Sequence, residues 1–238
     1  MKFWNFQKKI LVILAHPDDP EYFCGATIAK WTQEGHNVDY YLFTKGEKGI
    51  NNNYRITKNI ISIREKEQKF AAEVLGVKSV QYLSYKDGML VPNLEARKNI
   101  VRIIRALKPN IVVTCDPTNY YLNDNYLNHP DHRAAGQIVV DAVFPAPQNE
   151  LYFPELLSEQ LKPHHIEEVW LSLPKEANIT LDVTETWPLK VQALEEHTSQ
   201  IGDVMKFRAH MASKAAFKDK NNILHFEEKF CRIIFSNN

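Results

Sequence analysis

The strongest constraint on the fold is a regular alternation of short apolar runs with helical segments along the 238 residues. The first run, 10–15, is apolar at every position, which is typical of a parallel strand buried on both faces. Further strands are expected at 38–44, 80–83, 111–115 and 168–173, and helices at 25–31, 60–75, 94–107 and 132–143. Strands that alternate with helices predict an α/β fold, here a Rossmann-like open parallel sheet with helices on both faces.

The end of the chain has a different pattern. Segments 187–200 and 204–217 have helical periodicity, so a C-terminal helical extension of the sheet is expected. No repeat, low-complexity tract or linker interrupts the sequence, and its length suits one domain with a substantial core. We therefore expect a single domain over residues 1–238.

Charge, hydropathy and cysteine content argue against several classes of protein. Lys and Arg together number 29, as do Asp and Glu, and they are mixed along the chain. A nucleic-acid-binding protein gathers basic residues on one face, and an electrostatic membrane anchor needs a polybasic cluster. No apolar run approaches the roughly 18 residues of a membrane span, and run 10–15 is too short for a signal-peptide core. Because the three cysteines form no paired motif, no disulfide framework is expected. A cytoplasmic protein without nucleic-acid partner or membrane span is the simplest prediction.

Two polar segments follow strands that the predicted topology places side by side. In doubly wound sheets the common strand order is 3-2-1-4-5, and ligands bind where the order reverses, outside the carboxyl ends of strands 1 and 4. The segment 16–19, His-Pro-Asp-Asp, follows the first strand, and 129–132, His-Pro-Asp-His, follows the loop after the fourth. Although they lie far apart in sequence, this topology brings the two segments together.

The residue types in these segments suit a catalytic metal site. Two histidines and one carboxylate can hold zinc and leave a position for water. Adjacent Asp18 and Asp19 cannot readily both bind one ion, which favours one ligand and one general base. Asp131 can hydrogen-bond an imidazole and fix its tautomer. The structural alternative is that the carboxylates cap helices and the histidines are exposed; the pairing of two such segments favours the metal site.

Together with Glu21, segments 16–19 and 129–132 resemble the LmbE-like, or PIG-L, de-N-acetylase family. The resemblance extends over most of the chain and includes segments 44–49, 75–77, 87–88, 133–136, 153–157 and 197–200. That family includes deacetylases of N-acetylglucosaminyl-phosphatidylinositol, of thiol precursors and of diacetylchitobiose. The resemblance therefore implies zinc-dependent hydrolysis of the N-acetyl amide of an N-acetylglucosamine-type sugar or its conjugate, releasing acetate and a free amine.

The resemblance also implies roles for individual residues. Three of them, His16, Asp19 and His132, would hold the zinc ion. Asp18 would be the general base. His129, as a protonated imidazole, would stabilise the oxyanion or protonate the leaving amine. Asp131 would keep His129 in place.

Substrate contacts are implied less specifically. Arg64 and Asp87 match positions that touch the sugar or its substituent. Some relatives have an oxyanion-binding tyrosine where this chain has Leu127, and three nearby tyrosines, Tyr120, Tyr121 and Tyr126, are substitutes among which the sequence does not choose. His197 is first expected to serve packing or a subunit contact, and a homo-oligomer agrees with the resemblance.

Alternative functions differ in substrate or in class. The same zinc chemistry could serve an amidase that acts on a thiol conjugate or an acylated natural product. A non-catalytic carbohydrate- or metal-binding module would lack a ligand or the base, whereas this chain has all of them. A nucleotide-binding protein is disfavoured because no Gly-x-Gly-x-x-Gly follows the first strand.

Overall fold

A seven-stranded sheet forms the centre of the computed structural model, which describes residues 3–49 and 59–235. The strand order is β3-β2-β1-β4-β7-β11-β8. The five parallel strands are β1 (Lys9–Leu14), β2 (Asn37–Thr44), β3 (Ser79–Tyr85), β4 (Ile111–Cys115) and β7 (Glu168–Ser172). The expected order 3-2-1-4-5 is thus confirmed, with β7 as the fifth strand.

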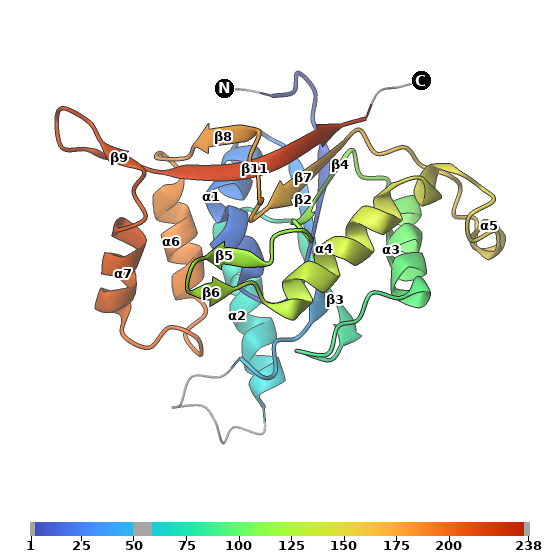
Figure 1. The fold of residues 1–238 in the computed structure, drawn as a ribbon, viewed down its shortest axis with the longest axis horizontal. Helices are drawn as coiled ribbons and strands as arrows, with labels where there is room; N and C mark the ends of the chain where they lie inside the picture. Colours follow the sequence, from blue (N-terminus) through green and yellow to red (C-terminus); the bar gives the residue numbers. More distant parts are fainter. Residues whose placement is uncertain (1–2, 50–58, 236–238) are drawn as a thin grey trace.

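Helices cover both faces of this sheet (Figure 1). Alternate residues of β1 belong to two separate cores, with Val12 in one and Ile13 in the other. The core of Val12 also takes side chains from α1 (Asp19–Gln33), α2 (Ile60–Val74), α6 (Trp187–Glu195) and α7 (Val204–Ala212). The core of Ile13 takes them from α3 (Leu94–Leu107), α4 (Pro130–Val143), η2 (Ala146–Gln148) and α5 (Glu155–Ser158). The predicted α/β architecture is therefore confirmed.

The C-terminal region is helical only in part, which corrects the expectation of a helical extension. After α6 and α7 the chain forms the hairpin of β9 (Phe217–Lys218) and β10 (Leu224–His225). It then returns to the sheet as β11 (Glu227–Ile234), antiparallel to β7 and to β8 (Ile179–Asp182). The sequence of β11 does not show the alternation of apolar and polar residues that is typical of a strand, because one of its inward-facing residues is charged. Glu228 is buried there, 2.6 Å from Nζ of Lys190.

The long loop after β4 carries a second hairpin, formed by β5 (Tyr121–Asn123) and β6 (Tyr126–Leu127). It leads directly into α4 (Figure 1). None of the helices within residues 3–49 and 59–235 has the length and the hydrophobicity that crossing a bilayer requires.

Gly136 sets how closely α4 approaches the end of β4. A Cβ atom at this buried position would collide with the carbonyl oxygen of Cys115 and lie 3.1 Å from the backbone nitrogen of Pro117. Because backbone atoms cannot move aside as a flexible side chain can, only glycine permits this approach. The first turn of α4, which carries His129 and His132, is thereby held beside the carboxyl end of β1.

We expect Gly136→Ala to lower the free energy of unfolding by about 1–3 kcal/mol, since overpacking at a rigid contact forces backbone shifts. Urea unfolding followed by circular dichroism measures the change. Gln137→Ala, on the exposed side of the same helix, is the matched control and should shift stability by less than about 0.5 kcal/mol. Equal stability of the two variants would contradict the packing argument.

Candidate active site

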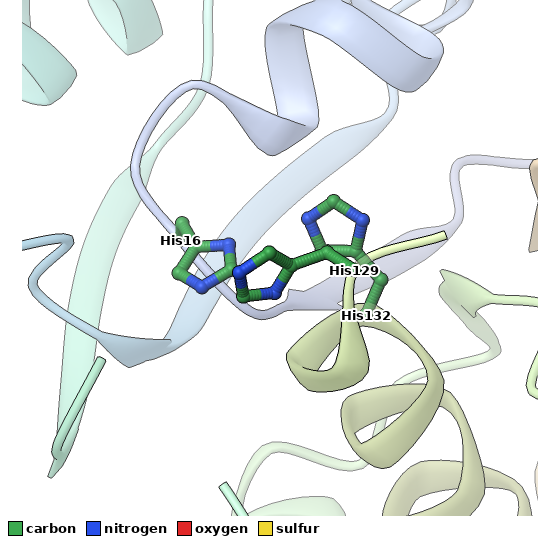
Figure 2. A group of neighbouring side chains, drawn as sticks. All are labelled: His16, His129 and His132. Atoms are coloured by element: carbon green, nitrogen blue, oxygen red, sulfur yellow. The ribbon is translucent and has the colours of Figure 1, made fainter. Parts of the chain in front are cut away.

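Side chains from distant parts of the sequence meet at the carboxyl end of β1. Figure 2 shows the imidazole of His16, which follows β1, beside those of His129 and His132 at the beginning of α4. The ring centres of His16 and His129 are 4.8 Å apart, those of His16 and His132 5.2 Å, and those of His129 and His132 5.1 Å. The predicted meeting of segments 16–19 and 129–132 at the switch point is confirmed.

Asp19 lies between two of these imidazoles. Its Oδ2 is 3.3 Å from Nδ1 of His16, and its Oδ1 is 3.1 Å from Nε2 of His132. Burial alone would raise the pKa of the Asp19 carboxyl, but the two imidazoles hold that pKa well below its usual range. The three residues that the family resemblance assigns to the metal therefore form one compact group.

Two further carboxylates hold the opposite edge of the His16 ring. Nε2 of His16 is 3.2 Å from Oδ2 of Asp131 and 3.2 Å from Oδ1 of Asp87. The backbone N–H of Gly88 donates to Asp131 over 2.7 Å, and that of Lys48 donates to Asp87 over 2.8 Å. Asp87 is thus buried behind His16, which differs from the substrate contact that the resemblance implied for it.

Within residues 3–49 and 59–235, potential metal-binding side chains form two groups that share His16. One group is His16, His129 and His132, and the other is His16, Asp87 and Asp131. The carboxylates of the second group already accept backbone N–H groups, whereas Nδ1 of His16 faces Asp19. A carboxylate on the outer nitrogen of a metal-binding imidazole commonly orients the ring. The candidate metal site is therefore on the Nδ1 side of His16. Asp87 and Asp131 contact the other ring nitrogen and orient the imidazole.

The charge around His16 agrees with a bound cation. Burial alone would lower the pKa of His16, but the carboxylates of Asp19, Asp131 and Asp87 outweigh burial and raise it to about 12. Three carboxylates surround one imidazole, so the negative charges of these four side chains exceed the positive charge that His16 can carry. A metal ion on the Nδ1 side would supply that charge.

Asp18 occupies an unusual backbone conformation immediately before α1. Its φ of 81° and ψ of −27° are left-handed, and its side chain is 30% exposed. Burial raises the pKa of the Asp18 carboxyl above its ordinary value, and the Arg64 guanidinium opposes this only in part. Among the residues that the structure describes, no N–H in the first turn of α1 donates to the Asp18 side chain. The helix-cap alternative for Asp18 is therefore wrong.

Arg64 lies beneath this loop and is only 2% exposed. Its Nη2 donates to Oδ2 of Asp18 and to the carbonyl of Pro17, both over 2.9 Å. Its Nη1 donates to the carbonyl of Gly46 over 2.6 Å. Any Cβ atom on Gly46, whose φ is +64°, would collide with the guanidinium. Arg64 thus supports the Asp18 loop, which differs from the sugar contact implied by the resemblance.

His129 is fixed by the backbone rather than by the carboxylate of Asp131. The N–H of Asp131 donates to Nδ1 of His129 over 3.1 Å, while the Asp131 carboxylate contacts His16 instead. A ring nitrogen that accepts a hydrogen bond carries no proton, so the proton of a neutral His129 is on Nε2. Burial, together with His16 and His132, also holds the pKa of His129 below its ordinary value. The geometry favours a neutral His129 over the protonated imidazole that the resemblance implied.

A cleft of about 900 Å³ opens beside this group. Asp18, Asp19 and His132 are among the side chains that line it. Its apolar lining comes from α1, the β5–β6 hairpin, the segment after β7 and the α6–α7 region, namely Tyr22, Phe23, Leu122, Leu173, Leu194, Ile201 and Phe207. Of the three tyrosines that the sequence left open, Tyr126 lines this cleft, whereas Tyr120 stacks over Arg133.

Three buried polar residues near Asp18 were not predicted to have a role at the site. Gln68, Glu21 and His197 are each at most 1% exposed and are linked to one another by hydrogen bonds. Gln68 lies in a strongly charged helix, where its helical spacing of four from Arg64 was the only available signal. Glu21 is part of the first motif, but the resemblance implies no role for it, and for His197 the sequence favours packing or a subunit contact.

Comparisons with known proteins show the family of this chain. The family model of the GlcNAc-PI de-N-acetylases, PIG-L, matches residues 11–143, a range that includes every candidate ligand and catalytic residue. The diacetylchitobiose deacetylase of Thermococcus kodakarensis is 36% identical over 197 residues, covering 83% of this chain and 72% of that protein. A probable N-acetyl-alpha-D-glucosaminyl L-malate deacetylase 2 of Bacillus anthracis is 31% identical over 200 residues, covering 82% of each.

A solved structure shares the fold over nearly the whole chain. The N,N'-diacetylchitobiose deacetylase from Pyrococcus horikoshii superposes with a TM-score of 0.84 at 29% identity, covering 95% of this chain and 84% of that one. Family model, sequence relatives and structure point to one group of enzymes. The chain belongs to the PIG-L family of de-N-acetylases.

Proposed function

We propose that this protein is a zinc-dependent deacetylase that hydrolyses the N-acetyl amide of an N-acetylglucosamine-type sugar or its conjugate. The observation that carries the proposal is the group of His16, Asp19 and His132, of which Asp19 and His132 line the cleft together with Asp18. This arrangement supports a metal, a carboxylate base and a bound substrate next to one another. Membership of the PIG-L family supports the same chemistry.

The donor set suits zinc. Each imidazole lies against one oxygen of the carboxylate that would hold the ion with it: Nδ1 of His16 is 3.3 Å from Oδ2 of Asp19, and Nε2 of His132 is 3.1 Å from Oδ1. Two imidazoles and one carboxylate are also the ligand types of a catalytic zinc site with an open position. When bound, zinc polarises a carbonyl oxygen and lowers the pKa of water to about 7.

The remaining steps belong to residues of the chain. Asp18, with a raised pKa, accepts the proton of the attacking water, and Arg64 orients its carboxylate through Oδ2. Nε2–H of a neutral His129 donates a hydrogen bond to the carbonyl oxygen as negative charge develops there. Because that His129 has no proton to spare, we assign protonation of the leaving amine to Asp18.

The cleft supports a substrate larger than a single sugar. Its volume of about 900 Å³ is near the upper end for small-molecule sites, which range over roughly 300–1,000 Å³. The relatives named above act on a disaccharide and on a sugar joined to malate, according to their names. We propose that the N-acetyl group lies at the Asp18 end and the attached group occupies the apolar part.

Acetate release tests the proposal directly. The purified protein should release acetate from N-acetylglucosamine conjugates such as diacetylchitobiose or N-acetylglucosaminyl-malate. A strong chelator should abolish the release, and added zinc should restore it. No release from any sugar conjugate would contradict the proposal and would favour the alternative amidase acting on a thiol conjugate, a reaction named for one relative, a mycothiol S-conjugate amidase.

Asp131→Asn is expected to weaken zinc binding by roughly 10–100-fold, the usual effect of altering a residue that orients a ligand. The amide can still accept the N–H of Gly88, but it is a poorer acceptor for the outer N–H of His16. Competition with a zinc-sensitive dye measures the affinity. Asp124→Asn, in the exposed turn of the β5–β6 hairpin, controls for the loss of one negative charge, and an equal change in both variants would contradict this assignment.

A further inference from the structure

Helix α2 presents a buried polar face to the active site. Arg64, Glu67 and Gln68 are 2%, 6% and 0% exposed, and their spacing of three and four residues places them on one side of the helix. Burying polar groups is unfavourable unless each finds a partner. The hydrogen-bond partners of these three side chains therefore identify the segments that this face of α2 supports.

Gln68 joins the backbone of Asp18 to a buried ion pair. Its Oε1 accepts the backbone N–H of Asp18 over 2.8 Å, and its Nε2 donates to Oε1 of Glu21 over 2.9 Å. The other oxygen of Glu21 lies 3.4 Å from Nε2 of His197. Both polar ends of the Gln68 amide are thus used, and the amide can be placed in only one of its two orientations.

The contact to Asp18 matters because the backbone there is strained. A residue other than glycine in the left-handed region is unfavourable, and it persists only where its surroundings hold it. Two side chains of α2 provide that hold, Gln68 at the N–H of Asp18 and Arg64 at its carboxylate. Relaxation of this residue would turn the proposed base away from its present position.

The same face of α2 contacts segment 197–200, which contributes to the lining of the cleft. Glu67 accepts hydrogen bonds from the Thr198 hydroxyl over 2.8 Å and from the N–H and hydroxyl of Ser199, both over 2.7 Å. His197 and Gln200, on either side of this pair, line the cleft together with Asp18. The helix therefore connects the loop of the proposed base with a segment from the far end of the sequence.

We propose that Gln68, oriented by the Glu21–His197 pair, is a positioning residue that holds Asp18 in its left-handed conformation. This inference rests on the proposed role of Asp18 as the base. A glutamine that only filled space would not need donor and acceptor in fixed places. Exchanging the side chains of Glu21 and Gln68 should therefore show whether Gln68 positions Asp18 or only fills space.

The first test exchanges the donor and the acceptor. Gln68→Glu places two carboxylates side by side and should reduce kcat by about 10–100-fold, since small displacements of catalytic groups have effects of this size. KM should change little, because Gln68 is not among the side chains that line the cleft. The kcat is measured per bound zinc ion, because a shift of Asp18 would also move its neighbour Asp19. The double variant Glu21→Gln/Gln68→Glu keeps the net charge and restores one donor facing one acceptor, so it should regain most of the lost kcat.

The second test needs no catalysis. Hydrogen exchange of the Asp18 amide, followed by NMR, should be about tenfold faster in Gln68→Met than in the wild type, as expected for one lost hydrogen bond. Lys69→Met, next to it on the exposed side of α2, should leave both exchange and kcat unchanged. Thermal unfolding of each variant checks that it is folded.

The outcomes separate the two proposals. Unchanged exchange at Asp18 in Gln68→Met, or a double variant no more active than Gln68→Glu, would overturn the positioning role. A wild-type protein that releases no acetate would contradict the proposed function instead. The exchange experiment would then still decide whether Gln68 holds Asp18.

Discussion

Asp18→Asn is expected to reduce kcat for acetate release by about 10²–10⁴-fold while zinc stays bound, because a positioned general base contributes an acceleration of this size. The asparagine oxygen can still accept the N–H of Arg64, which now meets Oδ2 of Asp18 at 2.9 Å. The loop should therefore keep its shape and lose only the proton acceptor. Steady-state kinetics together with metal analysis by mass spectrometry measure both quantities.

A suitable control for Asp18→Asn removes one carboxylate elsewhere. Asp141→Asn, on the exposed side of α4, should change neither kcat nor zinc content. Loss of zinc from Asp18→Asn would make Asp18 a ligand and would refute the division of roles between Asp18 and Asp19. Nearly full activity with zinc bound would show that another group accepts the proton.

His132→Ala is expected to lose zinc itself and, with it, all measurable activity. Its Nε2 lies 3.1 Å from Oδ1 of Asp19, so its removal leaves only one imidazole and one carboxylate for the metal. Altering residues that merely orient ligands already weakens binding by 10–100-fold, so loss of a ligand should weaken it by more than about 100-fold. Metal analysis after dialysis against a weak chelator measures the loss.

The control for His132→Ala is His210→Ala, which removes an exposed imidazole from α7. That variant should retain zinc and activity. A His132→Ala protein that keeps its full zinc content would show that His132 is not a ligand. In that case the group of His16, Asp87 and Asp131 would become the stronger candidate for the metal.

The variants Asp18→Asn and His132→Ala distinguish proton transfer from zinc binding, two functions that we assign to neighbouring residues. Asp18 and Asp19 are neighbours in sequence, yet Asp18 contacts Arg64 whereas Asp19 contacts His16 and His132. The left-handed backbone at Asp18 directs the two carboxylates to different partners. A loss of kcat with zinc retained in one variant, and a loss of zinc in the other, would match this geometry.

Much of the sheet could be predicted because local pattern and topology agree there. The continuous apolar run at 10–15 requires burial on both faces, and β1 does have a core on each side. Strands that alternate with helices leave few topologies, since crossover connections between parallel strands are almost always right-handed. The place of β11 could not be predicted in this way, because its inward-facing Glu228 interrupts the apolar alternation. The partners of Glu228 come from distant helices, namely Lys190 in α6 and the backbone N–H groups of Ala26 and Thr27 in α1.

From the amino-acid sequence alone one can identify the metal-binding donors and their places in the chain. They form two segments with imidazoles and carboxylates, each after a strand that ends at the same edge of the sheet. That followed from residue chemistry and from the common order of such strands. Which group each donor faces can be seen only in the folded chain. Asp131 and Asp87 contact His16, Arg64 and Gln68 contact Asp18, and His197 lines the cleft and contacts Glu21. These pairings depend on a left-handed residue, on a glycine that lets α4 approach β4, and on contacts between residues far apart in sequence. Local hydrophobic pattern carries no information about any of these three features.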